Sequence, residues 1–211
     1  MLWKPLRMEL KMKVRHNLTK LLNQVTDTDM VNGMDWYKKA RVFCYQLSLR
    51  ENISYVKVCG ILAALSPRNR WERNKIDAEN LIKHLRGTLE TRPLFGTYNA
   101  MVRKAIEIYE YGYDTGTITH ILNGPKITCF FENIYDANNM SVTVDTWMVL
   151  AAAGKYLSID ERPSVNKALV TKISDAIQEL AERHQMRPYE LQAILWCAIK
   201  RLNGPAAKDQ K

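Results

Sequence analysis

The sequence predicts an all-α protein. Apolar residues recur at the three-to-four-residue spacing of helices along the chain, and no segment alternates apolar and polar residues over the length of a strand. The composition is that of a folded chain, because 46% of the 211 residues are hydrophobic and 25% are charged, with only nine glycines and seven prolines. We therefore expect one helical catalytic unit over residues 1–204 and a flexible tail over 205–211.

The individual helices can be placed from their apolar positions and their stop signals. An amphipathic segment over 10–25 comes first, Asn32-Gly33 is expected to break the chain, and Asp35 is expected to cap a second helix. Nearly continuous apolar residues predict a buried central helix over 54–65, which Pro67 ends. Further helices are expected over 71–85, 99–111, 115–123, 126–135, 146–153, 164–183 and 188–202, with an irregular stretch over 88–98.

A stop signal at Gly112 divides these helices into two lobes. Residues 30–112 are expected to form one lobe, and residues 1–29 together with 113–204 the other.

The charge balance favours a polyanionic partner. Lys and Arg number 31 against 22 Asp and Glu, which leaves a net charge of +9 spread along the chain, as an extended nucleic-acid-binding surface requires. The cysteines and histidines lack the spacing of a metal site, so the four cysteines are interpreted as reduced core thiols. The apolar stretches are too short to span a bilayer, and we expect a cytoplasmic monomer with no membrane partner.

One pair of motifs carries the functional prediction. The segment Ile118-Thr-His-Ile-Leu-Asn-Gly-Pro-Lys126 is followed, nineteen residues after the lysine, by Asp145 within Val142-Thr-Val-Asp-Thr-Trp147. This arrangement resembles the helix-hairpin-helix DNA glycosylase superfamily, and in particular its endonuclease III-like members. The resemblance implies a two-lobed helical fold, double-stranded DNA bound across the cleft between the lobes, a flipped base and cleavage of its N-glycosidic bond, with Asp145 and Lys126 as catalytic residues.

The chemistry of base excision explains why these two residue types suit the reaction. The sugar becomes positively charged as the C1′–N bond breaks, and the carboxylate of Asp145 would stabilise that charge. Lys126 opens a helix, where the dipole disfavours its charge, and a neutral amine could attack C1′ and form a Schiff base that leads to AP-lyase cleavage. Two structural alternatives stay open: Asp145 can be a simple N-cap, and Lys126 can contact phosphate.

DNA contacts are expected at two places. At the hairpin, backbone N–H groups and a glycine without Cβ suit a phosphate, although Gly-Pro is also an ordinary helix-helix turn. The loop after Pro67 resembles the superfamily's Leu-Ser-x-Gln segment, which wedges into the duplex behind the flipped base, although a solvated surface loop would look the same. The expected DNA-binding residues are Asn123, Gly124, Pro125, Thr128, Arg68, Asn69, Arg70 and Trp71.

Three residues are expected to line a base pocket. Gln192 and Trp196 lie at i and i+4 of the last long helix, in a segment similar to a closing helix of phage-borne members, and Trp147 follows Asp145 closely. Core packing is the competing role for Trp196.

Departures from the superfamily pattern define the alternatives. The hairpin is about two residues short, Trp147 stands where His or Arg is usual, and the four-cysteine iron-sulfur loop is absent. No cofactor is therefore expected, apart from a monovalent cation that the hairpin could hold. Two other functions stay open: a phage enzyme that modifies the 5-substituent of hypermodified thymine or hydroxymethyluracil in DNA, and a catalytically inactive helix-hairpin-helix DNA-binding module.

Overall fold

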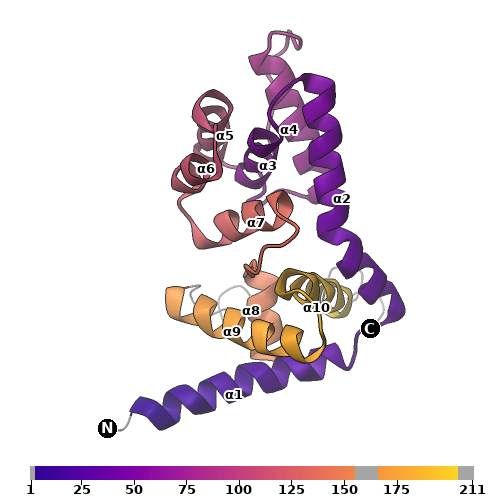
Figure 1. The fold of residues 1–211 in the computed structure, drawn as a ribbon, viewed down its shortest axis with the longest axis vertical. Helices are drawn as coiled ribbons and strands as arrows, with labels where there is room; N and C mark the ends of the chain where they lie inside the picture. Colours follow the sequence, from indigo (N-terminus) through magenta and orange to yellow (C-terminus); the bar gives the residue numbers. More distant parts are fainter. Residues whose placement is uncertain (1–2, 155–165, 204–211) are drawn as a thin grey trace. The chain divides into compact units, whose positions relative to one another are not determined.

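The computed structural model describes residues 3–154 and 166–203, with side chains from residue 13 onward, and all regular structure within these ranges is helical (Figure 1). The prediction of an all-α fold is confirmed for this part of the chain. Two compact units are present: unit 1 combines Met1–Tyr37 with Asn138–Lys211, and unit 2 is Lys38–Ala137. The division falls within helix α2 (Asp27–Glu51).

The structure assigns the hairpin to a different unit from the one expected. Residues 113–135 were expected with the terminal segments, but α6 (Thr115–Leu122) and α7 (Pro125–Tyr135) belong to unit 2. The physical reason is the central helix α3 (Tyr55–Ala64), because α6 and α7 both pack against it, as does α5 (Asn99–Tyr111). The stop at Gly112 is therefore a turn inside a unit and not a boundary between units.

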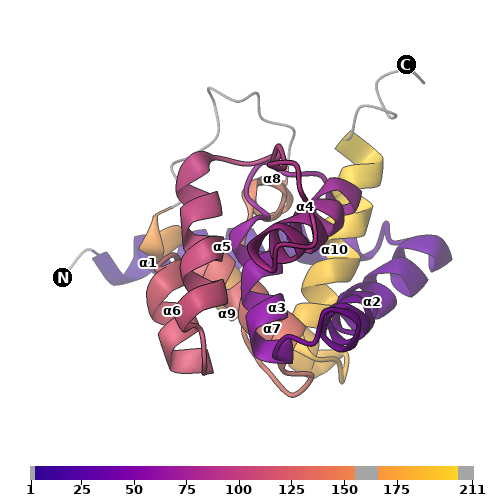
Figure 2. The same ribbon diagram turned by 90° about the horizontal axis from the view of Figure 1, so that it is seen from above.

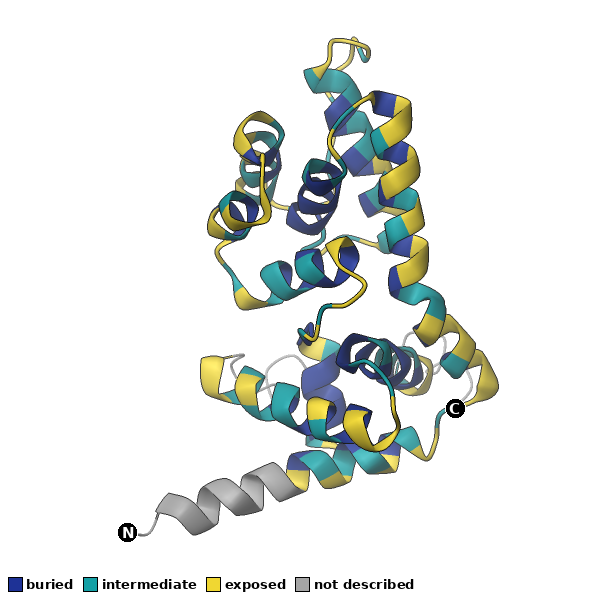
Figure 3. Ribbon diagram, in the orientation of Figure 1, coloured by how far each residue is buried: buried dark blue, intermediate teal, exposed yellow. Residues whose placement is uncertain are grey.

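Helix α3 forms the centre of unit 2 because it is apolar on nearly every face. Eight of its ten residues are buried, and α4 (Trp71–Leu85), α5, α6 and α7 surround it (Figures 2 and 3). Gly60 permits a close approach, since an added Cβ would lie 2.9 Å from Ile118 Cγ2 and 3.0 Å from Ile108 Cγ2. A larger residue at position 60 would separate α3 from the hairpin.

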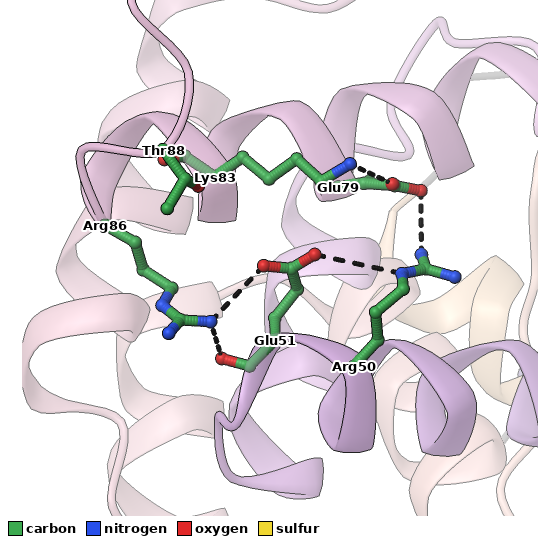
Figure 4. A network of polar contacts seen from close by, with 6 residues as sticks. All are labelled: Arg50, Glu51, Glu79, Lys83, Arg86 and Thr88. Carbon is green, nitrogen blue, oxygen red and sulfur yellow. Dashed lines mark hydrogen bonds and ion pairs between the residues drawn. The ribbon is translucent and has the colours of Figure 1, made fainter.

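A polar network joins the end of α2 to α4 at the edge of unit 2 (Figure 4). Arg86 donates to the backbone carbonyl of Glu51 and lies 3.3 Å from its carboxylate, while Arg50 and Lys83 both bind Glu79, at 2.9 and 2.6 Å. The Glu79 pairs are partly exposed and contribute little to stability, whereas Glu51 is only 6% exposed, so its contact with Arg86 is screened less by solvent.

Unit 1 is built from α1 (Trp3–Leu22), α8 (Thr146–Ala153), α9 (Lys167–Arg183) and α10 (Pro188–Asn203), together with the start of α2. Helix α8 is apolar on all faces and is covered by α1 and α10, which bury five of its eight residues. Asn17 of α1 donates to the Ala152 carbonyl at 2.8 Å, close to the last turn of α8. The sequence's most hydrophobic short helix thus lies in the core of unit 1.

The predicted break at Asn32-Gly33 is wrong, and so is the predicted cap at Asp35. Helix α2 begins at Asp27, after a capping box in which Thr26 Oγ1 accepts from the Asp29 N–H at 3.2 Å and Asp29 Oδ2 accepts from the Thr26 N–H at 3.0 Å. Gly33 lies inside the helix because it packs against the backbone of α10: an added Cβ would lie 2.4 Å from Ile194 Cα. A contact with a distant segment thus explains the glycine that looked like a helix break.

The other predicted helices are confirmed, most of them to within a few residues, although α1 begins seven residues before the predicted segment over 10–25. The predicted helix over 99–111 has the same bounds as α5, and the one over 146–153 has the same bounds as α8. The predicted irregular stretch over 88–98 is also present. Residues 164–165 and the predicted tail over 205–211 lie outside the described residues.

Candidate functional site

Asp145 occupies the N-cap of α8, as its sequence position predicted. The preceding residues Val142, Thr143 and Val144 are buried and lead into the helix. Asp145 has extended backbone geometry, and its Oδ1 accepts from the backbone N–H groups of Trp147 and Met148, each at 2.9 Å. These bonds satisfy two of the helix's free donors and place a carboxylate at the positive end of the helix dipole.

The second carboxylate oxygen of Asp145 is held from another helix. Trp196 of α10 donates its indole Nε1–H to Asp145 Oδ2 at 3.0 Å. The ammonium of Lys200 lies 3.9 Å from the centroid of the Trp196 ring, and Trp36 of α2 packs against the same ring in an edge geometry at 6.1 Å. Asp145 is half-buried, and its two oxygens have three N–H donors between them.

The three residues expected to wall a base pocket have different surroundings. Trp196 contacts Asp145 through its indole N–H, as described above. Trp147 is half-buried and packs against the apolar core of unit 1. Gln192 is 4% exposed, and its Oε1 accepts a hydrogen bond from the Tyr37 hydroxyl at 3.1 Å, beside Thr143. Gln192 thus belongs to a buried polar group, and its oxygen is already used.

The hairpin joins α6 and α7 through Asn123 and Gly124. Asn123 is exposed and adopts the left-handed conformation, with φ 42° and ψ 52°, and its N–H bonds back to the Thr119 carbonyl. The ammonium of Lys104, from α5, donates to the carbonyls of Ile121 and Leu122 at 2.7 and 2.5 Å. Lys104 therefore satisfies free carbonyl groups at the C-terminal end of α6. No local signal in the sequence indicates this role.

Helix α7 begins immediately after the turn, with Gly124 as its N-cap and Pro125 at its first position. Gly124 has extended geometry, with φ −165°, and an added Cβ would meet Ile127 Cγ1 at 3.5 Å, an ordinary contact. The fold therefore does not require glycine there. Lys126 and Thr128 are half-buried in the first turn of α7, and Lys126 forms no ion pair with any residue in the described ranges.

The opposite end of the hairpin is fixed by Asp114, the N-cap of α6. The backbone N–H and the hydroxyl of Thr117 both donate to its carboxylate, at 2.9 and 2.8 Å. These bonds hold the pKa of Asp114 below its ordinary value.

The loop after Pro67 is organised by a buried carboxylate in α4. Asp77 is fully buried and accepts from Asn69 Nδ2 at 2.9 Å, from the Gly96 N–H at 2.8 Å and from Arg73 Nε at 2.6 Å. Asn69 is thus turned inward and holds the loop in place. Asp77 was not singled out from the sequence, although a carboxylate four residues after Arg73 on a predicted helix was a visible signal.

The basic residues of this loop face outward. Arg68 and Arg70 are exposed, and Arg68 adopts a left-handed conformation with φ 58°, which is uncommon for a residue with a side chain. The Arg68 guanidinium lies 5.5 Å from the centroid of the Tyr98 ring. Trp71 is half-buried, with the Lys75 ammonium 5.6 Å from its ring.

The candidate residues therefore form three groups within their units. Unit 2 contains the hairpin residues and the loop of Arg68, while unit 1 contains Asp145 with Trp196. Within the described residues, no group of three or more His, Cys, Asp or Glu side chains could hold a metal ion, and no helix is long and apolar enough to cross a membrane. All four cysteines are free thiols, but only Cys44 and Cys59 lie in the core; Cys129 and Cys197 are half-buried, so the prediction of four core thiols is confirmed only in part.

Comparisons with known proteins identify a family without an assigned activity. A model of a family of unknown function (DUF7178) matches residues 6–203. No curated protein and no solved structure gives a significant match.

Proposed function

The chain belongs to the family of unknown function DUF7178, and from its own residues we propose that it is a DNA glycosylase with a helix-hairpin-helix fold. In this proposal a damaged or modified base is flipped out of the duplex and its C1′–N bond breaks, with the bonding electrons leaving on the base. The observation that carries the proposal is the Asp145 carboxylate, which three N–H donors from two helices hold in one orientation.

A fixed anion is what the reaction requires. Positive charge develops on the sugar as the base leaves, and a carboxylate that is already oriented stabilises this charge without reorganisation. Asp145 is half-buried, so its field is screened less by solvent than that of a surface carboxylate. The same residue is the one that the motif resemblance assigns to this role.

The hairpin is proposed as the contact with the DNA backbone. Three features support this assignment: the exposed left-handed turn at Asn123, the start of α7 with the side chain of Lys126, and a glycine at position 124 that the fold does not require. Arg68 and Arg70 are proposed as a second contact, because both side chains are exposed on a loop that Asp77 holds rigid. The net charge of +9 agrees with a polyanionic partner.

Lys126 is proposed as the amine of a bifunctional mechanism. Its attack on C1′ would displace the base and lead to a Schiff base, from which elimination cleaves the strand. The lack of an ion pair at Lys126 among the described residues supports this role, since a paired ammonium would be a poorer nucleophile.

A catalytically inactive DNA-binding module is the second candidate. The observation in its favour is again the environment of Asp145, because both carboxylate oxygens accept hydrogen bonds within the protein. Such a residue can serve only to cap α8 and stabilise the fold, with no role in catalysis. This candidate predicts salt-sensitive DNA binding and no product with any duplex.

Incubation with labelled duplexes tests the proposal directly. The duplexes carry a panel of damaged and modified pyrimidines and purines, and borohydride traps any Schiff base. We expect an abasic product with at least one duplex, and a covalent adduct that is lost in Lys126→Ala. Mass spectrometry of the digested DNA separates excision, in which a base is lost, from modification of a 5-substituent, in which the base stays attached in altered form.

A pair of N-cap variants tests the carboxylate of Asp145. In Asp145→Asn the amide oxygen can still accept from the Trp147 and Met148 N–H groups, but the amide NH2 cannot accept from the Trp196 indole N–H. We expect excision to be lost while DNA binding is retained. Asp114→Asn makes the same change at the N-cap of α6 and measures the effect of a cap charge alone. Full excision by Asp145→Asn would exclude the proposed role of this carboxylate.

The phosphate contact is tested by Gly124→Ala. The added methyl group meets only ordinary contacts in the fold, so the thermal stability should change little, whereas DNA affinity should fall because the backbone can no longer approach the phosphate closely. An unchanged affinity would remove the hairpin from the DNA contact.

A further inference from the structure

Trp196 is in a position to control the orientation of the Asp145 carboxylate. The two bonds to Oδ1 come from the backbone of α8 itself, whereas the bond to Oδ2 comes from α10. The torsion that turns a carboxylate about its Cβ–Cγ bond is broad, so a cap on one oxygen leaves the plane of the group loosely defined. The indole N–H fixes the other oxygen and therefore the plane.

The Trp196 ring is itself held on several sides. Lys200, one turn later on α10, has its ammonium 3.9 Å from the ring centroid, and Trp36 packs edge-on with an interplanar angle of 66°. A cation over the ring is attracted to the indole face and adds positive potential close to the N–H that Asp145 accepts. The neighbouring α10 residues Leu195 and Ala198 are fully buried, which anchors the helix that carries the ring.

These contacts leave Trp196 poorly suited to walling a base pocket. Its only hydrogen-bond donor is used by Asp145, and a face of its ring is covered by Lys200. A base that stacked on this face would have to displace the ammonium. The contacts of Trp196 are thus directed at the carboxylate and not at an open surface.

We propose that Trp196 is the positioning residue for Asp145: its N–H fixes the carboxylate plane, so that Oδ2 is held ready to face the developing charge on the sugar. This inference rests on the proposed glycosylase function. It adds two statements to that function: the indole N–H of Trp196 affects the reaction rate through Asp145, and Trp196 does not line the base pocket.

The test separates the N–H group from the packing of the ring. Trp196→Phe keeps an aromatic ring for Trp36 and Lys200 and removes the donor. A second form of the protein carries benzothienylalanine at position 196, in which sulfur replaces the N–H in a ring of nearly the same shape. This form keeps the test valid if the smaller phenylalanine disturbs the core of unit 1.

The readout is single-turnover excision on the duplex that the wild type processes, measured together with the affinity for that duplex and the thermal midpoint. We expect the rate at saturating protein to fall about tenfold or more in both forms, as loss of one hydrogen bond to a charged group implies. Affinity and thermal midpoint of the benzothienylalanine form should match the wild type. A purely structural role would change the thermal midpoint and leave the rate of folded protein unaltered.

Three other outcomes would contradict the positioning role of Trp196. A benzothienylalanine form with the wild-type rate would show that the N–H does not position Asp145, while the glycosylase function stands. Reduced affinity with an unchanged rate would assign Trp196 to DNA contact. A wild type without product on any duplex would remove the proposed function, and the positioning role with it.

Discussion

Replacing Asp77 by alanine should destabilise unit 2 strongly, because one buried carboxylate holds three donors. Asn69 Nδ2 and the Gly96 N–H bind it at 2.9 and 2.8 Å, and Arg73 Nε binds it at 2.6 Å. Hydrogen bonds to a charged group contribute about 1.5–3 kcal/mol each. The arginine is 47% exposed, so its bond is screened by solvent and adds about 1 kcal/mol or less.

Loss of the bonds from the other two donors, together with the gap left by the carboxyl group, should lower the free energy of unfolding by about 3–5 kcal/mol, in the range found when a buried partner is removed. Urea unfolding followed by far-UV circular dichroism measures this loss, and hydrogen exchange of the α4 amides locates it in unit 2. The effect should extend to DNA binding, since Arg68 and Arg70 lie on the loop that Asp77 holds.

The matched control is Glu79→Ala, two residues further along the same helix. Glu79 also binds two cations, Arg50 and Lys83, but its side chain is 28% exposed, so its removal should cost about 1 kcal/mol or less. If the Asp77 variant lost no more stability than the Glu79 variant, the reasoning from burial and donor count would be refuted.

Three further predictions concern other parts of the chain. Gly33→Ala should destabilise unit 1 by about 1–3 kcal/mol in thermal unfolding, because its methyl group would meet the backbone of Ile194; an unchanged midpoint would contradict the close packing of α2 on α10. For Asp29, burial raises the pKa, but the bonds from Arg201 and Thr26 outweigh it and bring the pKa below its ordinary value of 3.8. Its stabilising contribution should therefore be complete above this value and disappear as the pH falls through the lower folded pKa, so that wild type and Asp29→Asn converge in acid urea titrations. Arg68→Gln should reduce the slope of log affinity against log salt by about one, because the exposed guanidinium is proposed to contact the DNA backbone, whereas Lys167→Gln, at the start of α9, should leave the slope unchanged.

Much of the fold was readable from local signals. The all-round apolar pattern of 54–65 predicted the central helix, and Asp145 before an apolar run predicted the cap of α8, because both signals act within a few residues. At the start of α2 the local signals conflicted. The Thr26-x-x-Asp29 capping box was present in the sequence, but Gly33 looked like a break, and only its packing against Ile194 resolves the conflict.

The part of the candidate site that depends on local signals was also predictable. The hairpin turn and the position of Asp145 follow from residues that are adjacent in sequence. The indole bond from Trp196 joins residues 51 positions apart, and the ammonium of Lys104 reaches carbonyls 17 and 18 positions away. No spacing rule encodes such contacts, so Trp196 was interpreted as a pocket wall and Lys104 was not considered.

The division of the chain into units also sets an order for folding during synthesis. Unit 2 is one uninterrupted segment, Lys38–Ala137, and all the helices that surround α3 have been made once its last residue leaves the ribosome. Helix α1 precedes unit 2 in the chain, whereas its partners α8, α9 and α10 all follow unit 2. The apolar side of α1, with Leu18 at its centre, therefore stays uncovered until these partners have been made, after all the residues of unit 2.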